Sequence, residues 1–115
     1  MKLQVKPSEI SGTIIAPPSK SCTHRAIVLA SLAKGTSKIE KALICKDTTA
    51  TIQAMEAFGA TIKEDNDKLS IRGGRLKAPI EPIDCLNSGT TLRLCSGIAS
   101  LMDNNITLTG DESLK

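Results

Sequence analysis

The residues best suited to chemistry lie in two polar turns, each of which runs into a predicted helix. The first turn is residues 17–21, Pro-Pro-Ser-Lys-Ser, and Arg25 follows it by one helical turn. The second turn is residues 87–91, Asn-Ser-Gly-Thr-Thr, and Arg93 follows it in the same way. A helix N-terminus presents unpaired N–H groups and the positive end of the helix dipole, so hydroxyls and cations placed there form an anion site. Both turns therefore predict a site for phosphate or carboxylate.

The first turn supplies a cation and two hydroxyls. Lys20 is a compact charge able to reach an anion, while Ser19 and Ser21 can donate hydrogen bonds. Arg25 lies four residues beyond Ser21 and can share its helix face. A simpler interpretation of the turn is a capped helix with solvated basic side chains.

The second turn combines caps with a glycine. Asn87 and Ser88 can cap a helix, and Gly89 allows a ligand to approach the backbone closely. Here too a capped helix with a surface arginine, Arg93, is the simpler interpretation. Two such turns in one small chain favour a bis-anionic ligand or two anionic ligands bound side by side.

Other chemistries are disfavoured by the spacing of the residues. No G-x-x-x-x-G-K-[ST] phosphate loop surrounds Lys20 and no G-x-G-x-x-G is present, which argues against ATP and dinucleotide sites. A nucleophile at Ser21 or Cys22 is not expected to be activated by His24, because close neighbours on a helix point to different sides. Asp47 is predicted to cap a helix, with a ligand-facing role as the alternative.

Composition and charge narrow the class of protein. The chain has 115 residues, 40% hydrophobic and 23% charged, which is typical of one folded domain or a piece of one. It has one Phe and neither Trp nor Tyr, so it lacks the aromatic side chains that stack nucleic-acid bases. A net charge of +3 suits small phosphorylated molecules better than duplex DNA. No nucleic-acid or membrane partner is predicted, and with no secretory signal or membrane span the expected location is cytoplasmic.

The cysteines indicate reduced thiols rather than a metal or disulfide framework. Four cysteines are scattered without a C-x-x-C pair, and the single histidine does not complete a zinc set with them. No metal site is expected.

Periodicity and turn residues predict a mixed α/β order of elements. The predicted elements are strands at 3–5 and 13–15, a helix at 21–33 capped by Gly35, a strand at 37–44, a helix at 47–59, a β-hairpin at 62–71 turning at 64–67, a strand at 83–86, a helix at 91–102 and a strand at 106–109. The helix at 21–33 carries apolar residues at helical spacing, namely Cys22, Ala26, Leu29, Ala30 and Ala33. Ile52, Met55 and Phe58 are assigned to the core. Residues 110–115 complete no further element, which suggests a chain that has been cut.

Five separated segments together resemble the 5-enolpyruvylshikimate-3-phosphate synthase family. They are Pro17-Pro18-Ser19-Lys20-Ser21-x-Thr23-His24-Arg25-Ala26, Leu29-Ala30-Ser31-Leu32-Ala33-x-Gly35, Asp47-Thr48, Asn87-Ser88-Gly89-Thr90-Thr91-Leu92-Arg93 and Leu108-Thr109-Gly110-Asp111-x-Ser113-Leu114. The resemblance runs from about residue 3 to the last residue.

The resemblance implies transfer of the enolpyruvyl group of phosphoenolpyruvate to the 5-hydroxyl of shikimate 3-phosphate, with release of phosphate, in aromatic amino acid biosynthesis. By the family pattern, Lys20 contacts both substrates and has a catalytic role, and Ser21 and Arg25 hold shikimate 3-phosphate. The residues implied on the phosphoenolpyruvate side are Lys20, Asn87, Gly89, Thr90 and Arg93. Neither a metal nor an organic cofactor is implied.

The same resemblance implies an incomplete enzyme. Family members have two similar domains, each built from three βαβαββ units in an inside-out barrel, so residues 1–115 correspond to about one unit and the start of the next. The N-terminal strand is expected to pair with the other domain, and further catalytic carboxylates and arginines belong to that missing C-terminal domain. We therefore expect the chain alone to be inactive, with exposed apolar faces and sheet edges that favour dimerisation or low stability.

The family usually has Gly where this chain has Leu86, so the backbone path into the second turn is where this chain departs from the family pattern. Two alternatives stay open at this point. One is a free-standing anion-binding module without catalysis. The other is a related enolpyruvyl transferase acting on a nucleotide sugar, which the segment from Ser19 to Arg25 disfavours.

Overall fold

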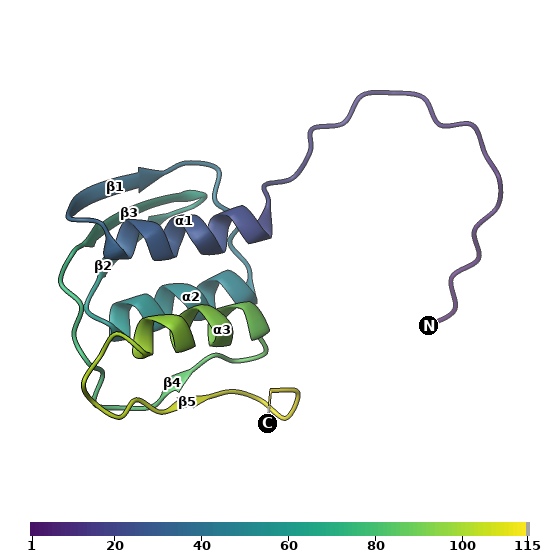
Figure 1. Ribbon diagram of the computed structural model, residues 1–115. Coiled ribbons are helices and arrows are strands. Elements are labelled where there is room, and N and C mark those ends of the chain that lie inside the picture. The colour runs from purple at the N-terminus through teal and green to yellow at the C-terminus, as the bar shows by residue number, and fades with distance from the viewer. Residues whose placement is uncertain (115) are drawn as a thin grey trace.

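Three helices lie between two small sheets in the computed structural model of the chain, which describes residues 1–114 (Figure 1). The helices are α1 (Lys20–Leu32), α2 (Lys46–Ala57) and α3 (Gly89–Ala99). Each begins within two residues of its predicted start, because the polar turns that precede them supply helix caps. The predicted mixed α/β fold class is confirmed.

The larger sheet contains the predicted hairpin. It has the order β1-β3-β2 and is antiparallel throughout, with β1 at Gly35–Ile39, β2 at Thr61–Asp65 and β3 at Lys68–Gly73. The β2–β3 turn includes Asn66 at φ 54°, a left-handed conformation that asparagine tolerates. The smaller sheet pairs β4 (Ile83–Asp84) with β5 (Leu108–Thr109) in parallel.

The core fills the space between the two sheets. Strand β3 buries Leu69 and Ile71 on one face, as the period-2 alternation of a half-buried strand requires. Helix α2 contributes Ile52, Met55 and Phe58, all of which are buried, so the predicted core assignment for this helix is confirmed. Helices α1 and α2 pack together, with α1 also packing on β3, while α2 and α3 pack near the smaller sheet.

The buried face of α1 is more polar than its sequence suggested. Leu29, one of the apolar residues that defined the helical pattern, is 67% exposed, and Cys22 is exposed as well. The helix instead buries Thr23, His24 and Ser31 beside its apolar core residues. The polar groups tolerate burial because hydrogen bonds, described below, replace most of those they would make to water.

The two N-terminal strand predictions were wrong for the isolated chain. Residues 1–19 form neither strand nor helix, are exposed throughout, and extend away from the folded part as an arm (Figure 1). Segments 3–5 and 13–15 have the alternating or β-branched pattern of strands, yet no strand of the described residues pairs with them. A strand needs a partner for its backbone hydrogen bonds, and local sequence does not provide one.

Several element ends were also corrected. The strand predicted at 37–44 ends at Ile39, before Lys41 at φ 55° reverses the backbone. The predicted cap Gly35 does have a left-handed φ of 95°, but it begins β1, and Ala33 in an extended conformation ends α1. The last helix ends at Ala99 rather than at 102. No helix within residues 1–114 has both the length and the apolar character needed to cross a membrane.

Candidate anion-binding site at the helix N-termini

All three helices begin at the same end of the folded part, on the right in Figure 1. Contacts between their first turns fix this arrangement. The Nζ of Lys20 in α1 lies 2.5 Å from Oδ2 of Asp47 in α2, and Oγ1 of Thr91 in α3 lies 3.3 Å from the backbone carbonyl oxygen of Asp47. We call the surface formed by residues 19–25, 45–48 and 87–93 the helix-start face. Three helix dipoles direct their positive ends towards it.

The first predicted turn is capped and anchored as well as basic. Ser19 is the N-cap of α1, and its Oγ accepts from the backbone N–H of Cys22 at 3.3 Å. The Thr23 hydroxyl donates to the Ser19 carbonyl and accepts from the Leu43 N–H, which ties the turn to the segment before α2. The helical spacing of Arg25 and Ser21 does bring them together, because Arg25 Nη2 donates to Ser21 Oγ at 2.9 Å.

Lys20 is oriented by Asp47. The hydrogen bond and the charge of Asp47 raise the pKa of the Lys20 ammonium, so Lys20 stays protonated at neutral pH. An ammonium has three donors, so one can bind Asp47 while the others serve a ligand. The sequence predicted a helix cap or a ligand-facing role for Asp47 but not its contact with Lys20, because nothing in the spacing reveals a partner 27 residues away.

Asp47 is not the helix cap that its sequence position predicted. Helix α2 starts one residue earlier, and its N-cap is Cys45. The Cys45 N–H donates to Thr48 Oγ1 at 2.9 Å, and the Thr48 backbone N–H lowers the pKa of the Cys45 thiol. Asp47 is thus left in the first turn, where a carboxylate is favourable to the dipole and free to contact Lys20.

The second predicted turn is also a helix cap. Ser88 is the N-cap of α3, and its Oγ accepts from the Thr91 N–H at 3.2 Å. Before it, Leu86 adopts φ 52°, so the leucine takes up a left-handed conformation that glycine adopts at less cost. The Leu86 N–H donates to Asp84 Oδ1, and its carbonyl accepts from the Asp111 N–H. These two hydrogen bonds hold the strained residue in place.

Asn87 fastens this turn to the last segment of the chain. Its Nδ2 donates to Asp111 Oδ2 at 2.7 Å and to Ser113 Oγ at 2.9 Å. The backbone N–H of Ser113 donates to Asp111 Oδ1, which closes a tight turn at 111–113. Both amide hydrogens of Asn87 are therefore engaged within the chain.

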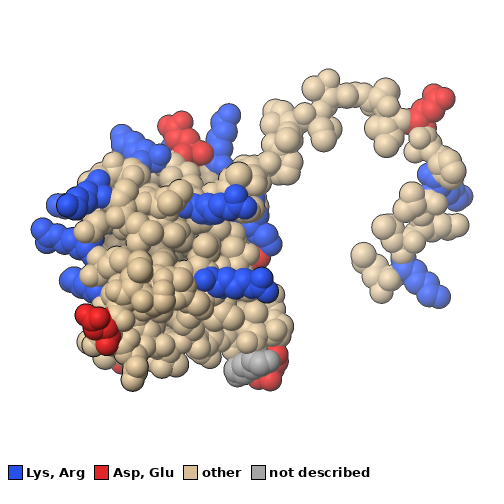
Figure 2. Space-filling model, in the orientation of Figure 1, with Lys and Arg blue, Asp and Glu red and all other residues tan. Residues whose placement is uncertain are grey.

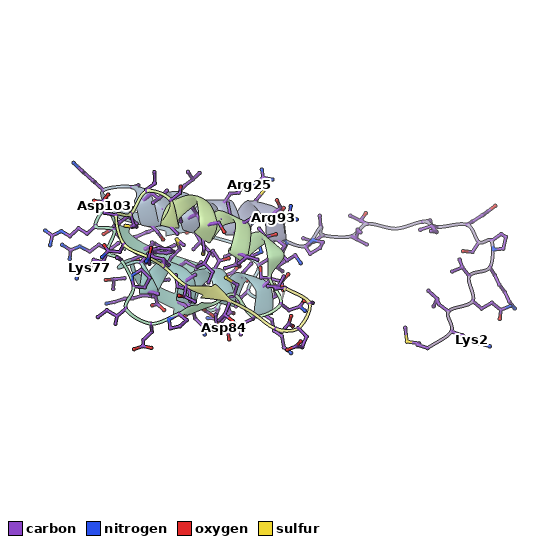
Figure 3. The ribbon with its side chains drawn as sticks, turned by 60° about the horizontal axis from the view of Figure 1, so that its bottom comes forward. Lys2, Arg25, Lys77, Asp84, Arg93 and Asp103 are labelled. Carbon is purple, nitrogen blue, oxygen red and sulfur yellow. The ribbon has the colours of Figure 1, made fainter. Side chains whose placement is uncertain are left out.

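The predicted site residues meet on one surface. Figure 3 shows Arg25 of α1 and Arg93 of α3 at the same end, whereas Lys77 lies at the other end of the helices. Lys20, Ser21 and Arg25 come from the first turn, and Gly89, Thr90 and Arg93 from the second. Lys and Arg side chains project from both ends of the folded part (Figure 2). Within residues 1–114 no three His, Cys, Asp or Glu side chains are grouped to hold a metal ion.

The fold and the site together define an α/β unit in which three helix N-termini converge on one face that carries Lys20, Arg25 and Arg93. Residues 5–115 match the family model of EPSP synthase (3-phosphoshikimate 1-carboxyvinyltransferase). The chain belongs to the EPSP synthase family.

Relatives and solved structures agree with this assignment. The chain is 51% identical to the 3-phosphoshikimate 1-carboxyvinyltransferases of Methanocorpusculum labreanum, over 99% of this chain, and of Nitrosopumilus maritimus, over all of it. It spans 28% of the length of each. An EPSP synthase structure from Acinetobacter baumannii superimposes with a TM-score of 0.82 at 36% identity, covering 90% of this chain and 24% of that one.

Proposed function

We propose that the chain is the N-terminal part of an enzyme that transfers the enolpyruvyl group of phosphoenolpyruvate to the 5-hydroxyl of shikimate 3-phosphate. The observation that carries the proposal is the meeting of two anion-binding turns on the helix-start face of a chain from this family. Because the chain spans 28% of its relatives, the complete activity belongs to a longer protein that includes a C-terminal domain. A cytoplasmic location remains part of the proposal.

In this proposal the first turn binds shikimate 3-phosphate. Arg25 and Ser21 already contact each other, so a phosphate can accept from the guanidinium and the hydroxyl together. Lys20 adds a charge that Asp47 orients without removing all of its donors.

The second turn binds phosphoenolpyruvate. Gly89 and Thr90 begin α3, so their backbone N–H groups are among those that a helix leaves unpaired. Arg93, exposed on the same helix, adds a positive charge. Asn87 lies in this group and, because both its amide hydrogens are engaged, contributes by fixing the backbone of the turn.

Lys20 is the proposed catalytic residue of this part. The 5-hydroxyl loses its proton as its oxygen bonds to C2 of phosphoenolpyruvate, and C3 gains a proton, which gives a tetrahedral intermediate. The bond from C2 to the phosphate oxygen then breaks, C3 loses a proton, and phosphate leaves. Negative charge shifts towards the leaving phosphate in the second step, and a protonated Lys20 between the two turns stabilises it. No residue of the helix-start face is assigned the proton transfers.

The test is a titration of the ¹⁵N-labelled 115-residue chain with shikimate 3-phosphate, followed by amide shifts at 20–25 and 87–93. Inorganic phosphate is the comparison ligand. We expect saturable shifts confined to these segments and a lower Kd for shikimate 3-phosphate than for phosphate. Equal affinity for the two would favour a general anion-binding module. Absence of shifts in a folded sample would refute binding by this part of the enzyme. Phosphate release from both substrates is expected to be undetectable with the chain alone.

A further inference from the structure

A buried line of hydrogen bonds runs between the two turns through α2. His24 Nδ1 lies 2.7 Å from Thr51 Oγ1, and Thr51 Oγ1 lies 2.7 Å from Thr91 Oγ1. Thr91 Oγ1 in turn donates to Ser88 Oγ at 2.7 Å. The four residues are at most 2% exposed. The line starts one residue before Arg25 and ends one residue before Gly89, so its two ends are joined covalently to the two halves of the site.

The protons of this line can be assigned from its unpaired atom. His24 Nε2 is buried and has no hydrogen-bond partner. If the imidazole proton is on Nδ1, it donates to Thr51, which donates to Thr91, which donates to Ser88. In this order the buried Nε2 carries a lone pair and no proton. The reverse order would bury an N–H group without an acceptor, and burial also lowers the pKa of His24 and keeps the ring neutral.

An imidazole and buried threonine hydroxyls join the three helices. Apolar side chains of the same volume would fill the space without the cost of desolvating polar groups, but their contacts would have no preferred donor–acceptor angle. Hydrogen bonds have narrow limits of distance and angle, and the two that cross between helices, His24–Thr51 and Thr51–Thr91, restrain how the three helices lie against each other. Thr91 Oγ1 also lies 3.3 Å from the carbonyl oxygen of Asp47, so the line passes beside the residue that orients Lys20.

We propose that His24, Thr51, Thr91 and Ser88 form a positioning relay that sets the separation of the two turns, so that the two substrates bind side by side. This inference rests on the proposed function. The members of the relay touch no substrate and are positioning residues. The relay therefore governs how well phosphoenolpyruvate binds when shikimate 3-phosphate is already present, more than how either ligand binds alone.

The test uses Thr51→Val, which removes the central hydroxyl and keeps the shape of the side chain. The Kd of shikimate 3-phosphate is read from amides 20–25, and the Kd of phosphoenolpyruvate at saturating shikimate 3-phosphate from amides 87–93. Thr51→Val is expected to change the first Kd by less than about twofold and to raise the second by about tenfold, the ratio expected when about 1.4 kcal/mol of coupling is lost. Thr51→Ser, which restores the hydroxyl, is expected to recover most of the affinity.

Ser31→Ala is the matched control, because Ser31 is equally buried in α1 but its hydroxyl bonds only to the Ile27 carbonyl of its own helix. It should leave both Kd values unchanged. An unchanged second Kd in Thr51→Val, or an equal rise in both, would overturn the relay. If the unmodified chain binds neither substrate, the proposed function fails instead.

A measurement on the unmodified chain guards against a variant that does not fold. Hydroxyl protons in short buried hydrogen bonds exchange slowly with water, so those of Thr51 and Thr91 should give separate NMR signals with contacts to the His24 ring. Absence of both signals in a folded sample would contradict the relay.

Discussion

The two ends of the helices are both basic, but only one end favours an anion. At the helix-start face, Lys20, Arg25 and Arg93 lie beside unpaired backbone N–H groups, so side chains and backbone have the same sign of charge. At the opposite end, a pocket of about 630 Å³ is lined by Lys34, Arg72 and Arg75 together with glycines and Thr61.

The opposite pocket lies at the C-terminal end of α1, where the helix dipole is negative and disfavours an anion. Its Gly73 lies against the carbonyls of Ala30 and Ser31, in the last turn of α1. Its cations therefore offset the negative end of the helix, whereas those of the helix-start face add to the positive end. A large pocket and several cations do not by themselves make an anion site. The direction of the neighbouring helix decides whether its backbone presents N–H donors or carbonyl oxygens to the ligand.

The largest effect we expect is a loss of stability at the opposite pocket, where Gly73 is packed closely against α1. A Cβ at Gly73 would lie 2.2 Å from the Ser31 carbonyl oxygen, which is backbone and has little room to move. Gly73→Ala is thus expected to cost about 3 kcal/mol or more of unfolding free energy, measured by urea denaturation. Gly97→Ala is the control, because open space surrounds Gly97 within α3, and it should gain about 0.5–1 kcal/mol. An unchanged free energy of unfolding in Gly73→Ala would show that this end of the helices is loosely packed.

The next effect is on ligand affinity, and it compares a lysine of the helix-start face with a lysine of the opposite pocket. Lys20→Ala removes a charged hydrogen-bond donor, so the Kd for shikimate 3-phosphate should rise about tenfold or more. Lys34→Ala removes the same charge just after the end of α1 and should change that Kd less than about twofold. Amide-detected titrations measure both. Similar losses in the two variants would mean that overall charge, rather than position, drives binding, and the contrast between the ends would disappear.

Much of this contrast could be predicted from the sequence, because it depends on local signals. The Ser19 and Ser88 caps, the i to i+4 contact of Arg25 with Ser21 and the β2–β3 hairpin all follow from neighbouring residues. The family resemblance added the substrates and the role of Lys20, which spacing alone left open.

The parts that were not predicted depend on contacts between distant segments. The pairing of Lys20 with Asp47 and the buried contact of His24 with Thr51 each join residues 27 positions apart. The segments at 3–5 and 13–15 have the pattern of strands but no partner in the described chain. Leu86 shows the reverse case, because tertiary hydrogen bonds hold a residue in a conformation that its type disfavours.

A smaller effect depends on pH and arises from His24 at the helix-start end. His24 is the only histidine, and burial lowers its pKa in the folded chain. The unfolded chain takes up a proton near pH 6.5, while folded His24 stays neutral to lower pH. The unfolded state therefore binds more protons as the pH falls from 7 to 5, and stability should decrease by up to about 1.4 kcal/mol per pH unit.

Urea denaturation between pH 5 and 7.5 measures this dependence. His24→Gln, which does not titrate, should flatten the curve even if it lowers stability at every pH. The same slope in both proteins would assign the pH dependence to other groups and would weaken the description of His24 as neutral and buried.

The smallest effect concerns backbone strain, which differs between the two ends of the helices. At the opposite pocket the left-handed positions are Gly35, Gly59 and Gly74, where glycine avoids the steric penalty. The left-handed residues other than glycine are Lys41, Asn66 and Leu86, of which Leu86 leads into the second turn and bears a cost of roughly 1–2 kcal/mol. Leu86→Gly removes this cost but also removes some side-chain packing. It increases the conformational entropy of the unfolded chain as well, which lowers the free energy of unfolding by about 0.5–1 kcal/mol.

We therefore expect Leu86→Gly to stabilise the chain by about 0.5 kcal/mol, measured by urea denaturation. Asn66→Gly is the comparison, because asparagine already tolerates a left-handed φ and should gain less. A loss of stability in Leu86→Gly would mean that packing of the half-buried leucine outweighs the strain. The packing of Leu86 would then stabilise the fold by more than its left-handed conformation costs, and backbone strain would no longer distinguish the two ends of the helices.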